Sequence, residues 1–183
     1  MKMPASFIAG DRGPWRIARV VAVRGEPLDP ARALTVVEDG AAAAGGAAWV
    51  LRGVRSHDRY TTRAEKDQLT MSSPPLGRPG MHAALIPIRK SAAWWQLAQD
   101  ERRAVIERSR HFPIGLEALP AVARRLYHSR DLGEDFDFLT WFEFAPDDAP
   151  VFDRLLLALR ATEEWRYVDR EVELRLVPAS DGA

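Results

Sequence analysis

The chain has 183 residues, enough for one substantial domain or two small fused modules. Acidic and basic residues balance at 26 each, so net charge favours neither a nucleic acid nor an anionic membrane as a partner. The absence of cysteine excludes disulfides, thiolate metal sites, iron–sulfur clusters and cofactors linked through cysteine. The sequence lacks an apolar run near the roughly 20 residues that span a bilayer and a signal-peptide pattern, which predicts a cytoplasmic protein.

The first third of the chain has the composition of short strands. Segments rich in Val, Ile, Ala and Trp are separated by Gly, Pro or Asp turns, which predicts strands over residues 6–9, 15–24, 33–37 and 47–54. Residues 61–69 are charged and permit a helix. The following run at 72–80, rich in Ser, Pro and Gly, is the best candidate for a boundary or a mobile loop.

The second half of the chain alternates between segments with strand periodicity and segments with helical periodicity. Residues 83–88 predict an apolar strand, and residues 100–110 predict a helix that stops near Pro113. Pro120 is placed to open a helix over 121–129. Residues 136–144 and 168–176 alternate as strands do, whereas 151–159 carry one helical apolar stripe. This order favours an α+β fold with helices covering one face of a sheet.

Candidate site residues are sparse when they are taken from chemistry alone. The four histidines, His57, His82, His111 and His128, show no paired metal-binding spacing. Phosphate-binding glycine motifs and the G-x-S-x-G pattern are also absent. A lone histidine is more often packed or exposed than a ligand, so these four do not define a site.

Other local features have ordinary explanations. Adjacent tryptophans, here Trp94 and Trp95 after Lys90, usually serve core packing. Arg124 and Arg125 fall in the predicted helix over 121–129, where a solvated face is the common outcome. The residues alone therefore indicate an α+β protein and leave its activity open.

Several long motifs occur between residues 48 and 177. They are LRGV with SHDRY at 51–60, ALIPIRKSAAWW at 84–95, QDERR at 99–103, LPAVARRLYH at 119–128, FDFLTWFE at 136–143 and RATEEW at 160–165. In this order they resemble the chlorite dismutase family. The part before them is shorter than in the long, pentameric members, so the chain resembles the short, dimeric branch.

The resemblance implies a fold and a cofactor. Family members carry two ferredoxin-like halves per subunit, of the dimeric α+β barrel type, with haem b in the C-terminal half. We therefore expect a truncated N-terminal half over residues 1–75 and a haem-binding half over 76–183. The expected partners are a small anionic substrate, chlorite, and a second copy of the chain in a homodimer, with no nucleic acid and no membrane.

The resemblance also implies roles for individual residues. His111 matches the proximal iron ligand, Glu164 matches the carboxylate that accepts a hydrogen bond from it, and Arg124 matches the distal arginine. The stretch that lines the haem and its propionates contributes further residues. These are Lys90, Trp94 and Trp95, together with Tyr60 from the N-terminal side.

The implied reaction is the conversion of chlorite to chloride and dioxygen. In this family, oxygen-atom transfer to ferric haem gives a ferryl species and hypochlorite, which then recombine. A guanidinium such as that of Arg124 keeps its charge at all working pH values and can hold both anions. The reaction consumes no net proton, so it can dispense with an acid–base histidine.

Two other readings of the resemblance remain open. Related proteins decarboxylate coproporphyrin-haem with a redox tyrosine and commonly lack the distal arginine. Arg124 argues against that activity, but Tyr60 or Tyr127 leaves it possible. The other reading is a weak peroxidase or a non-enzymatic haem-binding module.

One departure from the family pattern predicts that the enzyme completes fewer turnovers before it is inactivated. Short-branch relatives often carry glutamine at the position that aligns with Ser73, where it can hold the distal arginine toward the haem. Serine is too short for this, so we expect a more mobile Arg124 and earlier bleaching. A Ser73→Gln variant should complete more turnovers before inactivation than the wild type, and no gain would contradict the expectation.

Overall fold

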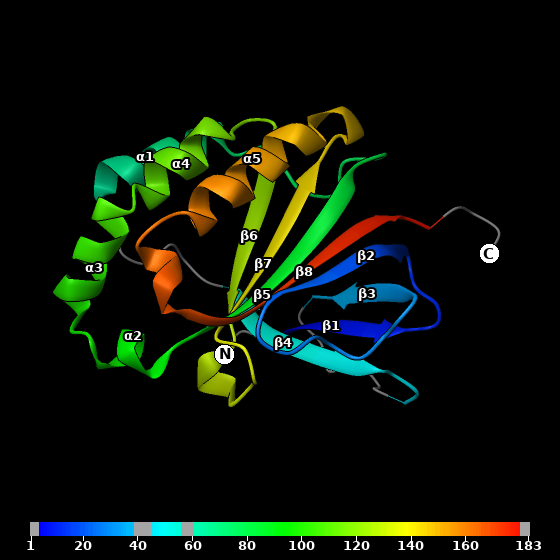
Figure 1. Cartoon of the computed structure of the whole chain (residues 1–183). Coiled ribbons are helices and arrows are strands. Elements are labelled where there is room, and N and C mark those ends of the chain that lie inside the picture. Colours follow the sequence, from blue (N-terminus) through cyan, green and yellow to red (C-terminus); the bar gives the residue numbers. More distant parts are fainter. Residues whose placement is uncertain (1–3, 39–44, 56–60, 180–183) are drawn as a thin grey trace.

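The computed structural model describes residues 4–38, 45–55 and 61–179 (Figure 1). The strands are β1 (Ala5–Gly10), β2 (Trp15–Arg24), β3 (Ala33–Val37), β4 (Trp49–Arg55), β5 (His82–Lys90), β6 (Val122–His128), β7 (Phe138–Phe144) and β8 (Val168–Pro178). The helices are α1 (Arg63–Ser72), α2 (Ala92–Gln96), α3 (Gln99–Arg108), α4 (His111–Glu117) and α5 (Ala149–Arg160), with 3₁₀ turns η1 (Arg130–Leu132), η2 (Pro146–Asp148) and η3 (Glu164–Tyr167).

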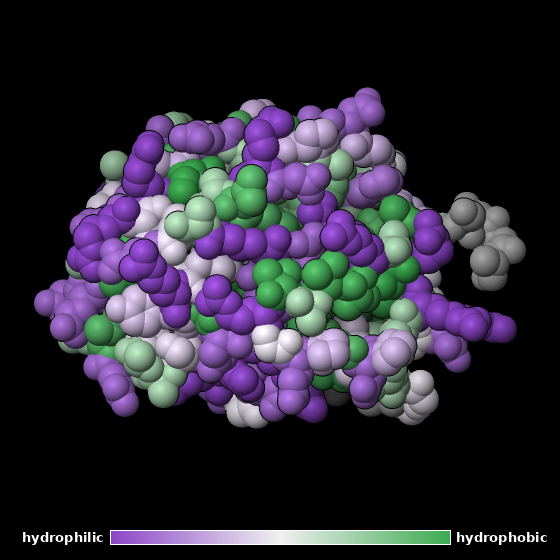
Figure 2. Space-filling view, viewed as in Figure 1, coloured by the Kyte–Doolittle hydropathy of each residue, from purple (hydrophilic) through white to green (hydrophobic). Residues whose placement is uncertain are grey.

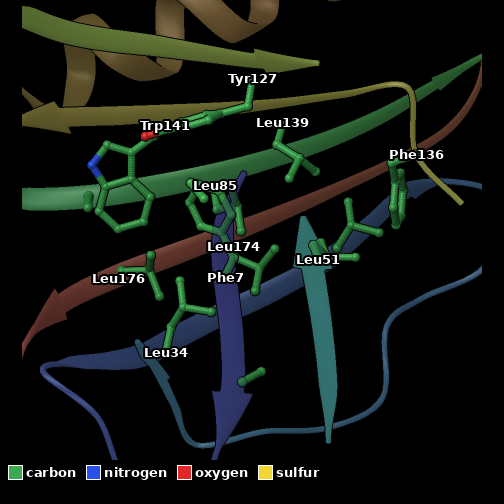
Figure 3. Close-up of a cluster of buried hydrophobic side chains, with 14 residues drawn as sticks. Phe7, Leu34, Leu51, Leu85, Tyr127, Phe136, Leu139, Trp141, Leu174 and Leu176 are labelled. Atoms are coloured by element: carbon green, nitrogen blue, oxygen red, sulfur yellow. The ribbon is translucent and has the colours of Figure 1, made fainter. Parts of the chain in front are cut away.

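The strands form one closed barrel in the order β1-β3-β2-β8-β5-β7-β6-β4, and every pairing is antiparallel. Alternate side chains point inward, as the period of a strand requires, and form the barrel core shown in Figure 3. This core includes Phe7, Leu34, Leu85, Leu139 and Leu174, none of which is exposed. The predicted α+β class is confirmed.

The helices gather on the outer face of the C-terminal strands β5 to β8, while the N-terminal strands carry none (Figure 1). Helix α5 packs on β7 through Phe152, whose ring centre lies 4.9 Å from that of Phe142 and 4.6 Å from that of Phe144. Helix α1 begins with a capping box between Thr62 and Glu65. In the described part of the chain, no helix combines the length and apolar character needed to span a bilayer.

The predicted strands and the helix over 151–159 are confirmed to within two residues at each end. The predicted helix over 121–129 is wrong, because this segment is strand β6. Its backbone pairs with β7 from Val122 to His128. Both faces of β6 are covered, by the barrel core at Tyr127 and by the helices at Val122, so tertiary packing outweighs a helical composition.

Pro113 does not end the predicted helix over 100–110. Helix α3 stops earlier, at Arg108, and Pro113 lies inside the first turn of α4, where a proline is tolerated. Between the two helices Arg110 adopts a left-handed conformation with φ of 52°. This turn makes His111 the first residue of α4.

Candidate functional site

A large cavity lies between the outer face of the barrel and the helices that cover it. The cavity is open to solvent on one side. Alternate residues of three neighbouring strands form its floor. They are Ile86, Ile88 and Lys90 of β5, Val122, Arg124, Leu126 and His128 of β6, and Phe138, Thr140 and Phe142 of β7. This alternation follows from strand geometry, because the intervening residues point the other way.

One face of α4 forms the helical wall of the cavity. His111, Gly115 and Ala118 of the α4 segment all line the cavity, with the four- and three-residue spacing of one helix face. A Cβ placed on Gly115 would meet no atom within 4 Å. Most of the lining residues are apolar. The cavity therefore suits a largely apolar ligand, and two imidazoles line it, that of His111 on the helical wall and that of His128 on the floor.

Glu164 connects His111 and Lys90. His111 Nδ1 lies 2.7 Å from Glu164 Oε2, and Lys90 Nζ lies 2.8 Å from Glu164 Oε1. Glu164 and Lys90 are each 6% exposed, and the Glu164 backbone N–H donates to Ser109 Oγ at 2.9 Å. Because Nδ1 is held by the carboxylate, Nε2 is the ring nitrogen of His111 that could bind a metal.

The charges around Glu164 keep it ionised. Burial by itself raises the pKa of this carboxyl, but the charges of His111 and Lys90 and their hydrogen bonds outweigh burial and hold the pKa well below its usual range. The Lys90 ammonium lies 4.4 Å from the ring centre of Trp94 and 5.6 Å from that of Trp165. These aromatic faces compensate part of the hydration that the buried cation has lost.

Arg124 reaches the same cavity from the opposite wall. It lies on β6, paired in register with Phe142 of β7, whereas His111 comes from α4. The neighbouring Arg125 points to the other side of the sheet, where its guanidinium donates to Glu38 at 2.9 Å. Strand alternation therefore separates the two adjacent arginines, and Arg124 is the one that lines the cavity.

The two adjacent tryptophans have different surroundings. Trp94 lines the cavity. Trp95 lies beside it, where its indole N–H donates to Asp137 Oδ2 at 3.2 Å and its ring contacts Arg102 and Arg130, with guanidinium-to-ring distances of 5.1 and 3.9 Å. Trp95 is thus held by a polar cluster next to the cavity.

The cavity brings together most of the residues named from the sequence. They are Lys90, Trp94, His111, Arg124 and Glu164. Tyr60 lies outside the described residues. Sequence reasoning missed Trp165, which lines the cavity and whose indole N–H donates to the buried Glu171 at 2.8 Å. Its place directly after Glu164 in the RATEEW motif was the available signal.

Comparisons with known proteins identify the family of this chain. The family model for chlorite dismutase matches residues 36–177. A crystal structure of dimeric chlorite dismutases from Nitrobacter winogradskyi is 53% identical, covers 96% of this chain and 99% of that one, and has a TM-score of 0.88. A chlorite dismutase variant from Candidatus Nitrospira defluvii, 20% identical over 97% of this chain and 92% of that one, shares the fold with a TM-score of 0.70.

A curated chlorite dismutase from Ideonella dechloratans is 39% identical over 85 residues. That match covers 46% of this chain and 28% of the relative, so it spans less than a third of the longer protein. The family model covers most of this chain, and the Nitrobacter protein matches it over almost its whole length. The chain therefore belongs to the chlorite dismutase family and resembles its short branch.

Proposed function

We propose that this protein is a haem b enzyme that converts chlorite to chloride and dioxygen. The observation that carries the proposal is His111, tied through Nδ1 to the buried Glu164 and facing a cavity that also receives Arg124. A carboxylate behind a ligating imidazole orients the ring and raises its basicity. The names of the matched family and of the Nitrobacter relative support chlorite as the substrate.

The donor set of the cavity fits haem b. His111 would hold the iron, and the apolar floor and the open face at Gly115 would receive the porphyrin. When bound, haem supplies a redox-active iron that can take an oxygen atom from chlorite. Lys90 has its ammonium on Glu164, so we propose that it steadies the proximal carboxylate and leaves contacts with propionates to other residues.

Arg124 would bind the anion and retain hypochlorite inside the cavity. A guanidinium in a largely apolar cavity interacts more strongly with an anion than it would in water. Retention would keep hypochlorite inside the cavity until dioxygen forms, which is a proximity effect. The Ser73 hydroxyl donates to the Leu69 carbonyl at 2.5 Å at the end of α1, so it is engaged within its own helix. The predicted gain in Ser73→Gln stays a prediction.

Coproporphyrin-haem decarboxylation is the less favoured candidate because Tyr127 faces away from the cavity. This tyrosine lies in the barrel core against Phe7, with ring centres 5.1 Å apart, and its hydroxyl donates to Glu38. Burial and the Glu38 carboxylate raise the pKa of the Tyr127 phenol. A redox tyrosine that serves a propionate would need to reach the haem, which Tyr127 does not.

Three measurements separate the candidate functions. The purified protein reconstituted with haem b should evolve dioxygen when chlorite is added, with one dioxygen for each chlorite consumed. Loss of propionates from coproporphyrin-haem on addition of peroxide would indicate the decarboxylase. A stable haem spectrum with neither reaction would indicate a binding module and would contradict the proposed enzyme.

We also propose the ferredoxin-like repeat, with halves over residues 1–75 and 76–183. Strands and helices of the second half follow the order β-α-β-β-α-β, and its sheet order is β8-β5-β7-β6. The first half has the corresponding sheet order β2-β3-β1-β4 when it is read in the opposite direction, and in its described residues no helix lies between the strands. Matching strand orders support a repeat whose two copies differ in this respect.

A homodimer is the proposed assembly, supported by the dimeric Nitrobacter relative. Strand β2 offers a surface for the second copy. It pairs with β3 at Trp15 and Arg16, so within the described residues its edge from Ala18 to Arg24 has no strand partner on that side. Val20 and Val23 are 41% and 36% exposed, and an apolar band follows β2 in Figure 2. An open antiparallel edge can pair with its own copy about a two-fold axis.

Two lysines on this edge should dissociate the dimer. In the double variant Val20→Lys and Val23→Lys, like charges would meet across the two-fold axis, and we expect a monomer in sedimentation velocity. Leu157→Lys on α5, which is 71% exposed at the wild-type residue, is the matched control and should stay dimeric. A double variant that remains dimeric would place the interface elsewhere, whereas a monomeric wild type would contradict the homodimer itself.

A further inference from the structure

Asp137 is a buried acid that lies just before β7 and does not line the described cavity. It is 4% exposed, and three donors converge on its carboxylate. Oδ2 accepts from the Lys90 backbone N–H at 2.7 Å and from Trp95 Nε1 at 3.2 Å, and Oδ1 accepts from Arg130 at 3.3 Å. A charged acceptor of this kind holds its donors more firmly than a neutral one does.

The hydrogen bond from the Lys90 backbone N–H to Asp137 takes the place of a bond to β7, whose pairing with β5 has already ended. Pairing between β5 and β7 ends at Ile88 and Phe138, so the Lys90 N–H lies beyond that ladder. On the other side, the register between β5 and β8 shifts between Arg89 and Lys90. Asp137 donates its own backbone N–H to the Ile88 carbonyl at 2.9 Å. Its side chain thus fixes the Lys90 backbone on the β7 side of β5, past the end of that ladder, while Lys90 is still paired with Val168 of β8.

We propose that Asp137 is a positioning residue for the His111 site, an inference that rests on the proposed haem function. By holding the Lys90 backbone, it keeps the Lys90 ammonium on Glu164, 2.8 Å from Oε1. The other carboxylate oxygen meets His111 Nδ1 at 2.7 Å. Asp137 thereby sets how much of the Glu164 charge acts on the imidazole.

The direction of the effect follows from charge. When the ammonium withdraws, the carboxylate charge acts on the imidazole N–H alone, so that hydrogen bond strengthens and the ring donates more electron density to the iron. The iron–histidine bond should then stiffen. General loosening of the fold would do the opposite, because a longer hydrogen bond from His111 to Glu164 weakens this effect.

Resonance Raman spectroscopy of the ferrous, haem b-reconstituted protein reads this bond directly. Asp137→Ala should raise the iron–histidine stretching frequency, in the same direction as Lys90→Met and by a smaller amount. Asp137→Asn keeps an oxygen that can accept from the Lys90 N–H, so it should recover most of the wild-type frequency. Asp135→Ala, an exposed carboxylate two residues earlier, is the matched control and should leave the frequency unchanged.

A merely structural role would lower the melting temperature without raising the frequency. An unchanged or lower frequency in Asp137→Ala would therefore overturn the inference. Should Asp137→Ala fail to fold, Asp137→Asn carries the test, because a neutral amide oxygen holds the Lys90 N–H less firmly than the carboxylate does. A small rise is then expected, and none would overturn the inference. A wild-type protein that takes up no haem would overturn the proposed function together with this role.

Discussion

Replacement of His111 by alanine is expected to abolish the Soret band of the reconstituted protein at haem concentrations that saturate the wild type. The imidazole is the proposed iron ligand, and its Nδ1 is already held 2.7 Å from Glu164. Loss of a hydrogen-bonding partner behind a metal ligand typically costs about 10–100-fold in affinity, and loss of the ligand should exceed the upper end. Absorption titration of the apoprotein with haem b measures the change.

Further experiments test whether the loss of haem binding is due to the missing iron–histidine bond. External imidazole should restore a Soret band to His111→Ala, because the cavity around the deleted ring is unchanged. His82→Ala should bind haem as the wild type does, since its ring packs on Phe144 with centres 6.5 Å apart, away from the described cavity. Glu164→Gln should bind haem more weakly than the wild type. An unchanged spectrum in His111→Ala would show that another residue holds the iron.

The parts of the fold that the sequence predicts are strands with a clear alternation or a continuous apolar run, and a helix with one apolar stripe. Strands such as 168–176 alternate clearly, because Val172 and Leu174 enter the barrel while Asp169 stays outside. Strand β6 carries no such contrast. Its inward Tyr127 and its outward Val122 are both buried, and its polar residues include Arg124 in the cavity. A strand covered on both sides loses the alternation that would identify it.

Part of the site can be predicted from local sequence, and the rest depends on contacts between residues that are far apart in the chain. Arg124 and Glu164 were named because they lie in short local motifs of the family, and His111 because it precedes Arg124 by the family's interval. The pair of Lys90 and Glu164 joins residues 74 positions apart. It depends on the end of β5 meeting η3. Asp137, which fixes that end, lies in the FDFLTWFE motif, but nothing in that motif pairs it with Lys90. Contacts of this kind follow from the closure of the barrel.

Arg124→Ala should keep the haem and lose the ability to survive chlorite. A hydrogen bond to a charged group is worth about 1.5–3 kcal/mol, which corresponds to about 10–100-fold in the retention of hypochlorite. Escaped hypochlorite oxidises the porphyrin and the protein, so the variant should complete about 10–100-fold fewer turnovers before its Soret band bleaches. Dioxygen yield per haem, measured with and without a hypochlorite scavenger, checks both the number of turnovers and the cause.

Two further variants separate charge, geometry and general disturbance of β6. Arg124→Lys keeps the positive charge but loses the planar pair of donors, so it should fall between the wild type and alanine. Arg125→Ala removes the adjacent guanidinium, which binds Glu38 on the other side of the sheet, and should retain the wild-type number of turnovers. If Arg124→Ala survives chlorite as the wild type does, the retention of hypochlorite depends on another group. Arg125 cannot be that group, because it faces away from the cavity and binds Glu38.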